Sequence, residues 1–317
     1  MLSGEFHPVL DPVVVESIVE FTPWWLALAL VFLTHLGSVY VVVPATVLAY
    51  LRYPERAGTW LGAIFCYFGL MTAVKSLNPA TRPTVDPAVG PDQVPEALSF
   101  WYTHGAEIAT TSFPSGNVMV ATVLMALLVL DTNVFTFRRR ILAGGFFVVL
   151  VAYSRLALGV HYPVDVIGGV ALGLALVGLI VLLRNRTEDE VAAVFTLAVI
   201  LCAAAVWLQT GLWTPPSVTG LESSNRPLAL GASIGGLLAW QFGRRSTWSL
   251  GREPSDTLIP MAGLLGALGG VYVVHTSVSH PLLSILWTAA LVAAVVATPW
   301  LWPKRLFSTD RPDVVSK

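Results

Sequence analysis

The sequence predicts an all-α protein built as a polytopic bundle of transmembrane helices, and three observations support this class. Hydrophobic residues make up 55% of the 317 residues and charged residues only 12%, about half the charged share of an ordinary soluble domain. The mean hydropathy is +0.73. Uncharged stretches of about 20 residues, enough to cross a bilayer core, recur along the whole chain. The protein is therefore expected to lie in a lipid bilayer. Its net charge of −1 gives no reason to expect a nucleic acid partner.

We count about nine candidate spans along the chain. They cover residues 24–51, 58–76, 116–132, 141–157, 166–184, 190–209, 227–243, 258–276 and 281–301. The N-terminus is expected to lack the basic region and cleavage site of a signal peptide. Its residues 11–21 are expected to form a short amphipathic helix at the membrane interface. The two cysteines, Cys66 and Cys202, both lie inside apolar runs and are expected to be buried without a disulfide.

The basic residues predict how the spans are oriented. With nine spans, the connections after spans 1, 3, 5 and 7 and the C-terminal tail share one side of the membrane. That side carries 14 of the 18 Lys and Arg residues, namely Arg52, Arg56, Arg138, Arg139, Arg140, Arg184, Arg186, Arg244, Arg245, Arg252, Lys304, Arg305, Arg311 and Lys317. The positive-inside rule makes it cytoplasmic, so a multi-pass protein of the cell membrane is expected, with its N-terminus outside and its C-terminus in the cytoplasm.

Four cations fall on the predicted outer side, and three of them belong to short motifs. The motifs are KSLNPATRP at 75–83, PSG at 114–116 and SRLALGVHYPVD at 154–165. Each motif lies where a predicted span leaves or enters the membrane, and all three lie on the same side. Taken singly, they are explained by interfacial cations, a helix cap and a local hydrogen bond. Their coincidence on one side favours an anion site.

The residue types in these motifs suit a phosphoryl group. Arg82 and Arg155 offer planar, permanently charged donors that match phosphate oxygens, and Lys75 adds a compact charge. Ser115 and the backbone N–H of Gly116 stand at a predicted helix N-terminus, where unpaired donors and the helix dipole favour an anion.

The third motif also contains a nucleophile and a group that can orient it. His161 can attack phosphorus as a neutral imidazole, and Asp165, four residues later, can accept the other ring proton and so fix the tautomer. Pro163 suits the first turn of the following helix, so the two residues are expected where a loop becomes a helix.

The patterns K-x6-RP, PSG and SR-x5-H-x3-D together resemble the signature of the type-2 phosphatidic acid phosphatase family, which shares its site with vanadium haloperoxidases. The resemblance covers about residues 58–184. It implies a phosphohistidine formed on His161, orientation of that histidine by Asp165, and no metal or other cofactor. It also implies lipid phosphate or diphosphate (for example polyprenyl diphosphate) substrates at the outer leaflet. The implied phosphate ligands are Lys75, Arg82, Ser115, Gly116 and Arg155.

The resemblance divides the chain into three parts. Residues 1–23 are expected to form an extracellular segment with the interfacial helix. Residues 24–186 are expected to form the membrane phosphatase core, in the N-terminal five spans. Residues 187–317 are expected to form a four-helix membrane extension for packing or for a protein partner that the sequence does not identify.

Asn117 departs from the family pattern, in which this position is a histidine that protonates the leaving group. Asparagine is a possible leaving-group contact but has no proton to give at neutral pH. Three accounts are open. The substrate is a diphosphate, which releases phosphate without strong protonation. Alternatively, a water or another residue supplies the proton, with His104, Glu107 and His35 as candidates. In the third account the site binds lipid phosphate with little turnover.

Two other classes of function use the same features. A lipid phosphotransferase would resolve the phosphohistidine with an alcohol in place of water and needs the same residues. A transporter or lipid-binding protein would use the cations for recognition only, but it would be expected to carry charges or broken helices near the membrane midplane.

Overall fold

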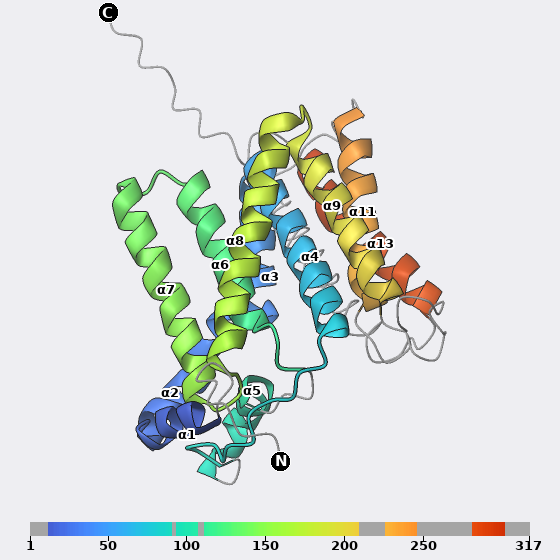
Figure 1. Ribbon diagram of the computed structural model, residues 1–317. Helices are drawn as coiled ribbons and strands as arrows, with labels where there is room; N and C mark the ends of the chain where they lie inside the picture. Colours follow the sequence, from blue (N-terminus) through green and yellow to red (C-terminus); the bar gives the residue numbers. More distant parts are fainter. Residues whose placement is uncertain (1–11, 91–92, 107–110, 209–225, 246–280, 302–317) are drawn as a thin grey trace, which may run out of the picture.

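The computed structural model describes residues 12–90, 93–106, 111–208, 226–245 and 281–301, and the regular structure within these ranges is helical (Figure 1). In chain order the elements are α1 (Pro12–Glu20), α2 (Trp24–Thr34), the 3-10 helix η1 (His35–Gly37), α3 (Val39–Arg52), α4 (Pro54–Leu77), α5 (Glu96–Ala106), α6 (Gly116–Asp131), α7 (Phe137–Ala157), α8 (Pro163–Arg186), α9 (Glu190–Trp207), α11 (Arg226–Arg245) and α13 (Pro281–Leu301). The all-helical class predicted from composition is confirmed for these residues.

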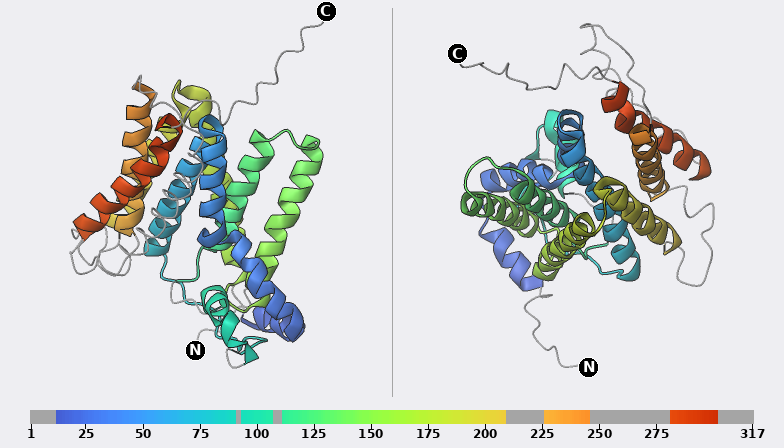
Figure 2. Two further views of the ribbon diagram at one scale, coloured as in Figure 1. Left: turned by 180° about the vertical axis from the view of Figure 1, so that it is seen from behind. Right: turned by 90° about the horizontal axis from the view of Figure 1, so that it is seen from above.

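Helix α4 lies at the centre of the bundle and separates two groups of helices. On one side it packs against α3, α6 and α8, with α7 packed on α6, and on the other it packs against α9 and α11, with α13 packed on α11. The view from above in Figure 2 shows α11 and α13 set to one side of the remaining helices. The main hydrophobic cluster runs through both groups, from Tyr50 and Trp60 to Phe195 and Trp240. The C-terminal helices therefore share a core with the helices that carry the three motifs.

Five of the described helices are long and apolar enough to cross a membrane, or up to six if the bent pair α1–α2 forms one span. The five are α4, α7, α8, α9 and α13. Several place large apolar side chains on the outside of the bundle, as lipid contact requires, including Phe146 on α7 and Leu174 on α8.

The count of nine spans is not confirmed. The predicted span 24–51 divides into α2 and α3, with η1 between them, and α3 and α6 are apolar but shorter than a full span. Helix α11 coincides with the predicted span 227–243 but is not among the five. The predicted span 258–276 lies outside the described residues.

Helices α1, α2 and α5 gather at one end of the bundle (Figures 1 and 2). At this same end α4 and α7 finish, and α6 and α8 begin. The opposite end carries an ion-pair cluster in which Arg184 contacts Asp131 at 3.0 Å and Glu190 at 3.2 Å. The three motifs therefore lie at the end covered by the short helices.

Glycines set the close approach of two helix pairs. A Cβ added at Gly169 of α8 would lie 2.8 Å from the Ser115 carbonyl oxygen, and one at Gly173 would lie 3.0 Å from that of Met119. Close backbone approach through small residues is common between membrane helices. Here it holds the start of α8, which carries Asp165, against the start of α6.

The second pair gives a prediction about stability. A Cβ at Gly69 of α4 would lie 2.7 Å from both Cys202 N and Leu201 C on α9, so rigid backbone would have to move. We expect Gly69→Ala to destabilise the protein by about 1–3 kcal/mol, as overpacking does. Gly178→Ala on α8 is the matched control, since nothing lies within 4 Å of its added Cβ. Thermal unfolding of both variants in detergent tests this, and equal melting temperatures would contradict it.

Candidate active site

The pair His161 and Asp165 forms where the chain passes from α7 into α8. Gly159 has a φ of 69°, a left-handed conformation that suits glycine, and it turns the chain after α7. Asp165 lies in the first turn of α8, where its Oδ2 accepts the backbone N–H of Tyr162 at 2.8 Å. The same oxygen lies 3.2 Å from His161 Nδ1, and both side chains are buried. The i,i+4 relation predicted from the sequence is therefore a direct contact.

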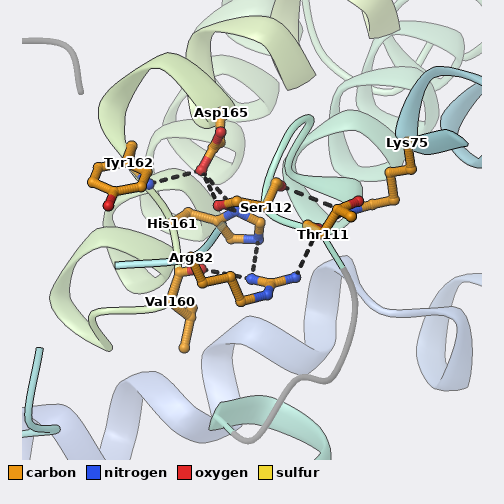
Figure 3. Close-up of polar contacts among 8 residues, drawn as sticks. All are labelled: Lys75, Arg82, Thr111, Ser112, Val160, His161, Tyr162 and Asp165. Atoms are coloured by element: carbon orange, nitrogen blue, oxygen red, sulfur yellow. Dashed lines mark hydrogen bonds and ion pairs between the residues drawn. The ribbon is translucent and has the colours of Figure 1, made fainter. Parts of the chain in front are cut away.

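The contact of His161 with Arg82 fixes the tautomer of the imidazole. Arg82 Nη1 lies 3.3 Å from His161 Nε2 (Figure 3). A guanidinium only donates hydrogen bonds, so Nε2 must carry a lone pair and the ring proton resides on Nδ1, which donates to Asp165. Burial lowers the pKa of His161, and the charges of Arg155 and Arg82 lower it further, while Asp165 opposes the shift. The ring is therefore neutral, with Nε2 available as a nucleophile.

Backbone carbonyls anchor the two cations of the first motif. Arg82 Nη1 donates to the Val160 carbonyl at 2.6 Å, and Nη2 donates to that of Thr111 at 3.3 Å. Lys75 Nζ donates to the Thr111 carbonyl and lies 3.5 Å from that of Ser112. Figure 3 shows both side chains converging on the segment that precedes α6. Hydrogen bonds to the carbonyls of residues 111 and 112 thus connect the first motif to the segment that leads into the PSG motif.

Ser112 belongs to the site although the sequence did not single it out. Its hydroxyl donates to Asp165 Oδ2 and lies 3.5 Å from His161 Nδ1, and the residue is fully buried. Asp165 Oδ2 therefore accepts from a hydroxyl, an imidazole and a backbone N–H. These bonds stabilise the ionised carboxylate that orients the imidazole. The serine lies 53 residues from its partner, and no local sequence pattern marks it.

The PSG motif forms the start of α6. The Phe113–Pro114 peptide bond is cis, and Ser115 N donates to the Asp165 carbonyl at 3.0 Å. Ser115 is buried, and its hydroxyl has no hydrogen-bond partner in the described part of the chain. Gly116 begins the helix, where the first backbone N–H groups have no intrahelical acceptor. An anion at this position could accept hydrogen bonds from the Ser115 hydroxyl and from the first backbone N–H groups of α6.

Arg155 lies inside the protein near the end of α7, with only 1% of its surface exposed. Its Nη1 donates to Thr34 Oγ1 and to the Gly105 carbonyl, each at 2.8 Å. Its Nε and Nη2 have no partner among the described residues. A buried guanidinium with an unpaired edge is costly unless an anion meets it, so the geometry is that of an anion ligand.

Comparison with protein-family models yields one match, to the PAP2 superfamily, over residues 57–189. This match supports a family like the type-2 phosphatidic acid phosphatases. No curated protein and no solved structure matches the chain. The PAP2 segment contains all three motifs, whereas α1, α2, α3, α9, α11 and α13 lie outside it. Members of the superfamily are phosphatases and related phosphoesterases, which supports a hydrolase of phosphoric esters in general.

Asn117 in this PAP2 segment does not donate to the site. Its Nδ2 lies 3.1 Å from the Thr34 carbonyl and 3.3 Å from Thr34 Oγ1. Because a carbonyl oxygen only accepts hydrogen bonds, the amide nitrogen of Asn117, and not Oδ1, faces it. The amide nitrogen thus donates to Thr34.

Three residues were candidates to protonate the leaving group in place of Asn117, and the structure describes the side chain of one of them, His35. His35 is buried and its Nε2 donates to the Trp101 carbonyl at 2.8 Å. His104 lies on α5, but its side chain is outside the described part, and Glu107 lies outside the described residues altogether. None of the three is brought to His161 by a described contact.

The lowered pKa of His161 predicts how stability depends on pH. A histidine whose folded-state pKa lies below its ordinary value of 6.5 binds fewer protons when folded than when unfolded. Stability is therefore lost as the pH falls from about 6.5 toward the folded-state pKa, by up to about 1.4 kcal/mol per pH unit. His161→Asn removes this dependence. Thermal unfolding at about pH 7.5 and about pH 5 should show a larger acid-induced loss in the wild type than in the variant. Equal losses would contradict the neutral buried imidazole.

Proposed function

We propose that this PAP2 protein is a membrane phosphatase that hydrolyses lipid phosphates or diphosphates through a phosphohistidine on His161. The observation that carries the proposal is the environment of its imidazole. Asp165 holds the Nδ1 proton at 3.2 Å, while Nε2 presents its lone pair to the cation Arg82 at 3.3 Å. A phosphoryl oxygen drawn to this guanidinium brings its phosphorus next to the nucleophilic nitrogen.

The reaction has two steps. In the first, the Nε2 lone pair forms a bond to phosphorus while the bond from phosphorus to the leaving-group oxygen breaks, and the imidazolium that results is stabilised by Asp165. In the second, water attacks phosphorus, the N–P bond breaks, and the water proton passes to solvent as inorganic phosphate forms. The guanidinium of Arg82, the Ser115 hydroxyl and the unpaired edge of Arg155 stabilise the charge on the phosphoryl oxygens in both steps.

The surroundings of the site favour a lipid substrate. Large aromatic side chains are exposed at the site's end of the bundle, namely Phe21 in the turn between α1 and α2, Trp24 and Trp25 on α2, and Phe100 on α5. Aromatic residues of this kind prefer the interface between membrane and water. The arginines of residues 138–140, 184 and 186 lie at the far ends of α7 and α8, so the positive-inside rule supports an outer-leaflet location for the site.

The test measures inorganic phosphate released by the purified protein from lipid monophosphates and diphosphates in mixed micelles, with trapping of an acid-labile phosphoenzyme. Release of phosphate together with a trapped phosphohistidine is the expected result. Transfer of the phosphoryl group to an added alcohol, without net release of inorganic phosphate, would identify a phosphotransferase instead. Binding of lipid phosphate without turnover would contradict the phosphatase and indicate a lipid-phosphate-binding protein. If the protein neither bound nor turned over lipid phosphates, the proposal would be overturned.

A further inference from the structure

Thr34, at the end of α2, contacts two residues of the site from outside the PAP2 segment. Its hydroxyl accepts Arg155 Nη1 at 2.8 Å and Asn117 Nδ2 at 3.3 Å, and its carbonyl accepts the same amide at 3.1 Å. The residue is fully buried. Other buried helical threonines of the described chain, such as Thr46, donate to a carbonyl of their own helix. The hydroxyl of Thr34 instead accepts hydrogen bonds from residues of α6 and α7.

The guanidinium of Arg155 is held on one edge and unpaired on the other. Thr34 Oγ1 and the Gly105 carbonyl fix Nη1 at 2.8 Å each, whereas Nε and Nη2 have no partner in the described part of the chain. The charge of Arg155 also contributes to lowering the pKa of His161, so the two groups lie within electrostatic range. Fixing Nη1 therefore determines where the unpaired donors point relative to the nucleophile.

Close packing keeps Thr34 at this position. A Cβ added at Gly105 of α5 would lie 3.3 Å from each of Thr34 Cγ2, His35 Nε2 and Val31 Cγ1. A Cβ added at Gly37 of η1 would lie 2.8 Å from the Asn117 carbonyl oxygen and 2.9 Å from Val151 Cγ1. The end of α2 is thus packed closely by α5, α6 and α7: a side-chain carbon at Gly37 would force neighbouring atoms to move, and one at Gly105 would be tightly packed.

We propose that Thr34 is a positioning residue that holds Arg155 with its Nε and Nη2 edge toward the bound phosphoryl group, which makes helix α2 a part of the site. This inference rests on the proposed function and extends it beyond the PAP2 segment. The ligand of the unpaired edge is a phosphate or the terminal phosphoryl group of a diphosphate, since a planar fork of donors matches two phosphate oxygens.

The experiment compares Thr34→Val, which replaces the hydroxyl by a methyl group, with Thr34→Ser, which keeps the hydroxyl. Thr46→Val is the matched control, because Thr46 is also buried and its hydroxyl donates to the Val42 carbonyl of its own helix, α3. For each protein we would measure kcat and KM for a lipid phosphate and the affinity for inorganic phosphate by calorimetry. Thr34→Val should weaken phosphate binding and raise KM by about tenfold or more, as expected for a lost hydrogen bond to a charged group. Thr34→Ser and Thr46→Val should stay near the wild type.

A double-mutant cycle with Arg155→Lys separates positioning from general packing. The lysine keeps the charge but loses the fork, so Thr34→Val should add little to its defect, and effects that simply multiply would overturn the inference. Unchanged phosphate affinity in Thr34→Val, or an equal loss in Thr34→Ser, would also overturn it. A wild type that binds inorganic phosphate but releases none from any lipid phosphate would refute the proposed function alone, and the binding data would still decide the role of Thr34.

Discussion

Replacing His161 by alanine is expected to lower phosphate release by about 10⁴-fold or more and to abolish the trapped phosphoenzyme, as loss of an essential nucleophile does. The structural reason is that His161 Nε2, whose lone pair faces Arg82, is the nucleophilic nitrogen that the described contacts bring to this cation. Asp165→Asn is expected to give a smaller loss, because it removes the acceptor that fixes the ring proton on Nδ1 and leaves the nitrogen atom in place.

Two controls keep this result interpretable. Calorimetry with inorganic phosphate reports the anion ligands Arg82, Ser115 and Arg155 without any reaction, and His161→Ala should retain that binding. Ser233→Ala removes a buried hydroxyl on α11 that donates to the Ala229 carbonyl, far from the motifs in sequence, and it should leave turnover unchanged. Undiminished hydrolysis by His161→Ala with a normal melting temperature would refute the phosphohistidine step.

The arrangement of the motifs could be predicted from the sequence because it follows from helix direction. Alternate helix ends lie at the same end of a bundle, so the end of α4, the start of α6 and the loop at His161 had to share one end once the helices were placed. The local relation of His161 to Asp165 could be predicted for the same reason, since residues four apart at a helix start lie close together.

Ser112 and Thr34 could not be predicted, because their contacts depend on packing between distant segments. Ser112 meets Asp165 across 53 residues, and Thr34 meets Arg155 across 121 residues. Neither residue stands in a pattern that differs from an ordinary apolar helix or its flanking loop. The Thr34 contact accompanies the close approaches of helices at Gly37 and Gly105, which the sequence alone does not reveal.

The break within the predicted span 24–51 also has a tertiary cause. The stretch carries no Asp, Glu, Lys or Arg, and its proline, Pro44, lies inside α3 without ending it. The helix instead ends at Thr34, where η1 packs Gly37 on the Asn117 carbonyl and the Ser38 hydroxyl donates to the His35 carbonyl at 2.7 Å. Hydropathy measures the length of an apolar stretch and does not show where the helix within it ends.

Replacing Asn117 by histidine is expected to raise the turnover of lipid monophosphates by about 10²-fold, the lower range of general acid catalysis, and to change diphosphate turnover little. A lipid alkoxide is a poor leaving group that needs a proton, whereas a phosphate leaves without one. The native amide cannot help, since Nδ2 is committed to the carbonyl and hydroxyl of Thr34. Phosphate release from matched monophosphate and diphosphate substrates measures the ratio directly.

The pH dependence of the variant distinguishes proton donation from a change in packing. A general acid works only when protonated, so the gained monophosphate activity should disappear as the pH rises through the pKa of the new imidazole. Asn117→Gln supplies the control, because it keeps an amide and adds length without adding a proton. An equal gain for both substrates, or a gain that persists at high pH, would show that the new side chain acts by repacking α6 against α2. A wild type that already cleaves monophosphates as fast as diphosphates would instead require another proton donor, and the substitution should then have little effect on either substrate.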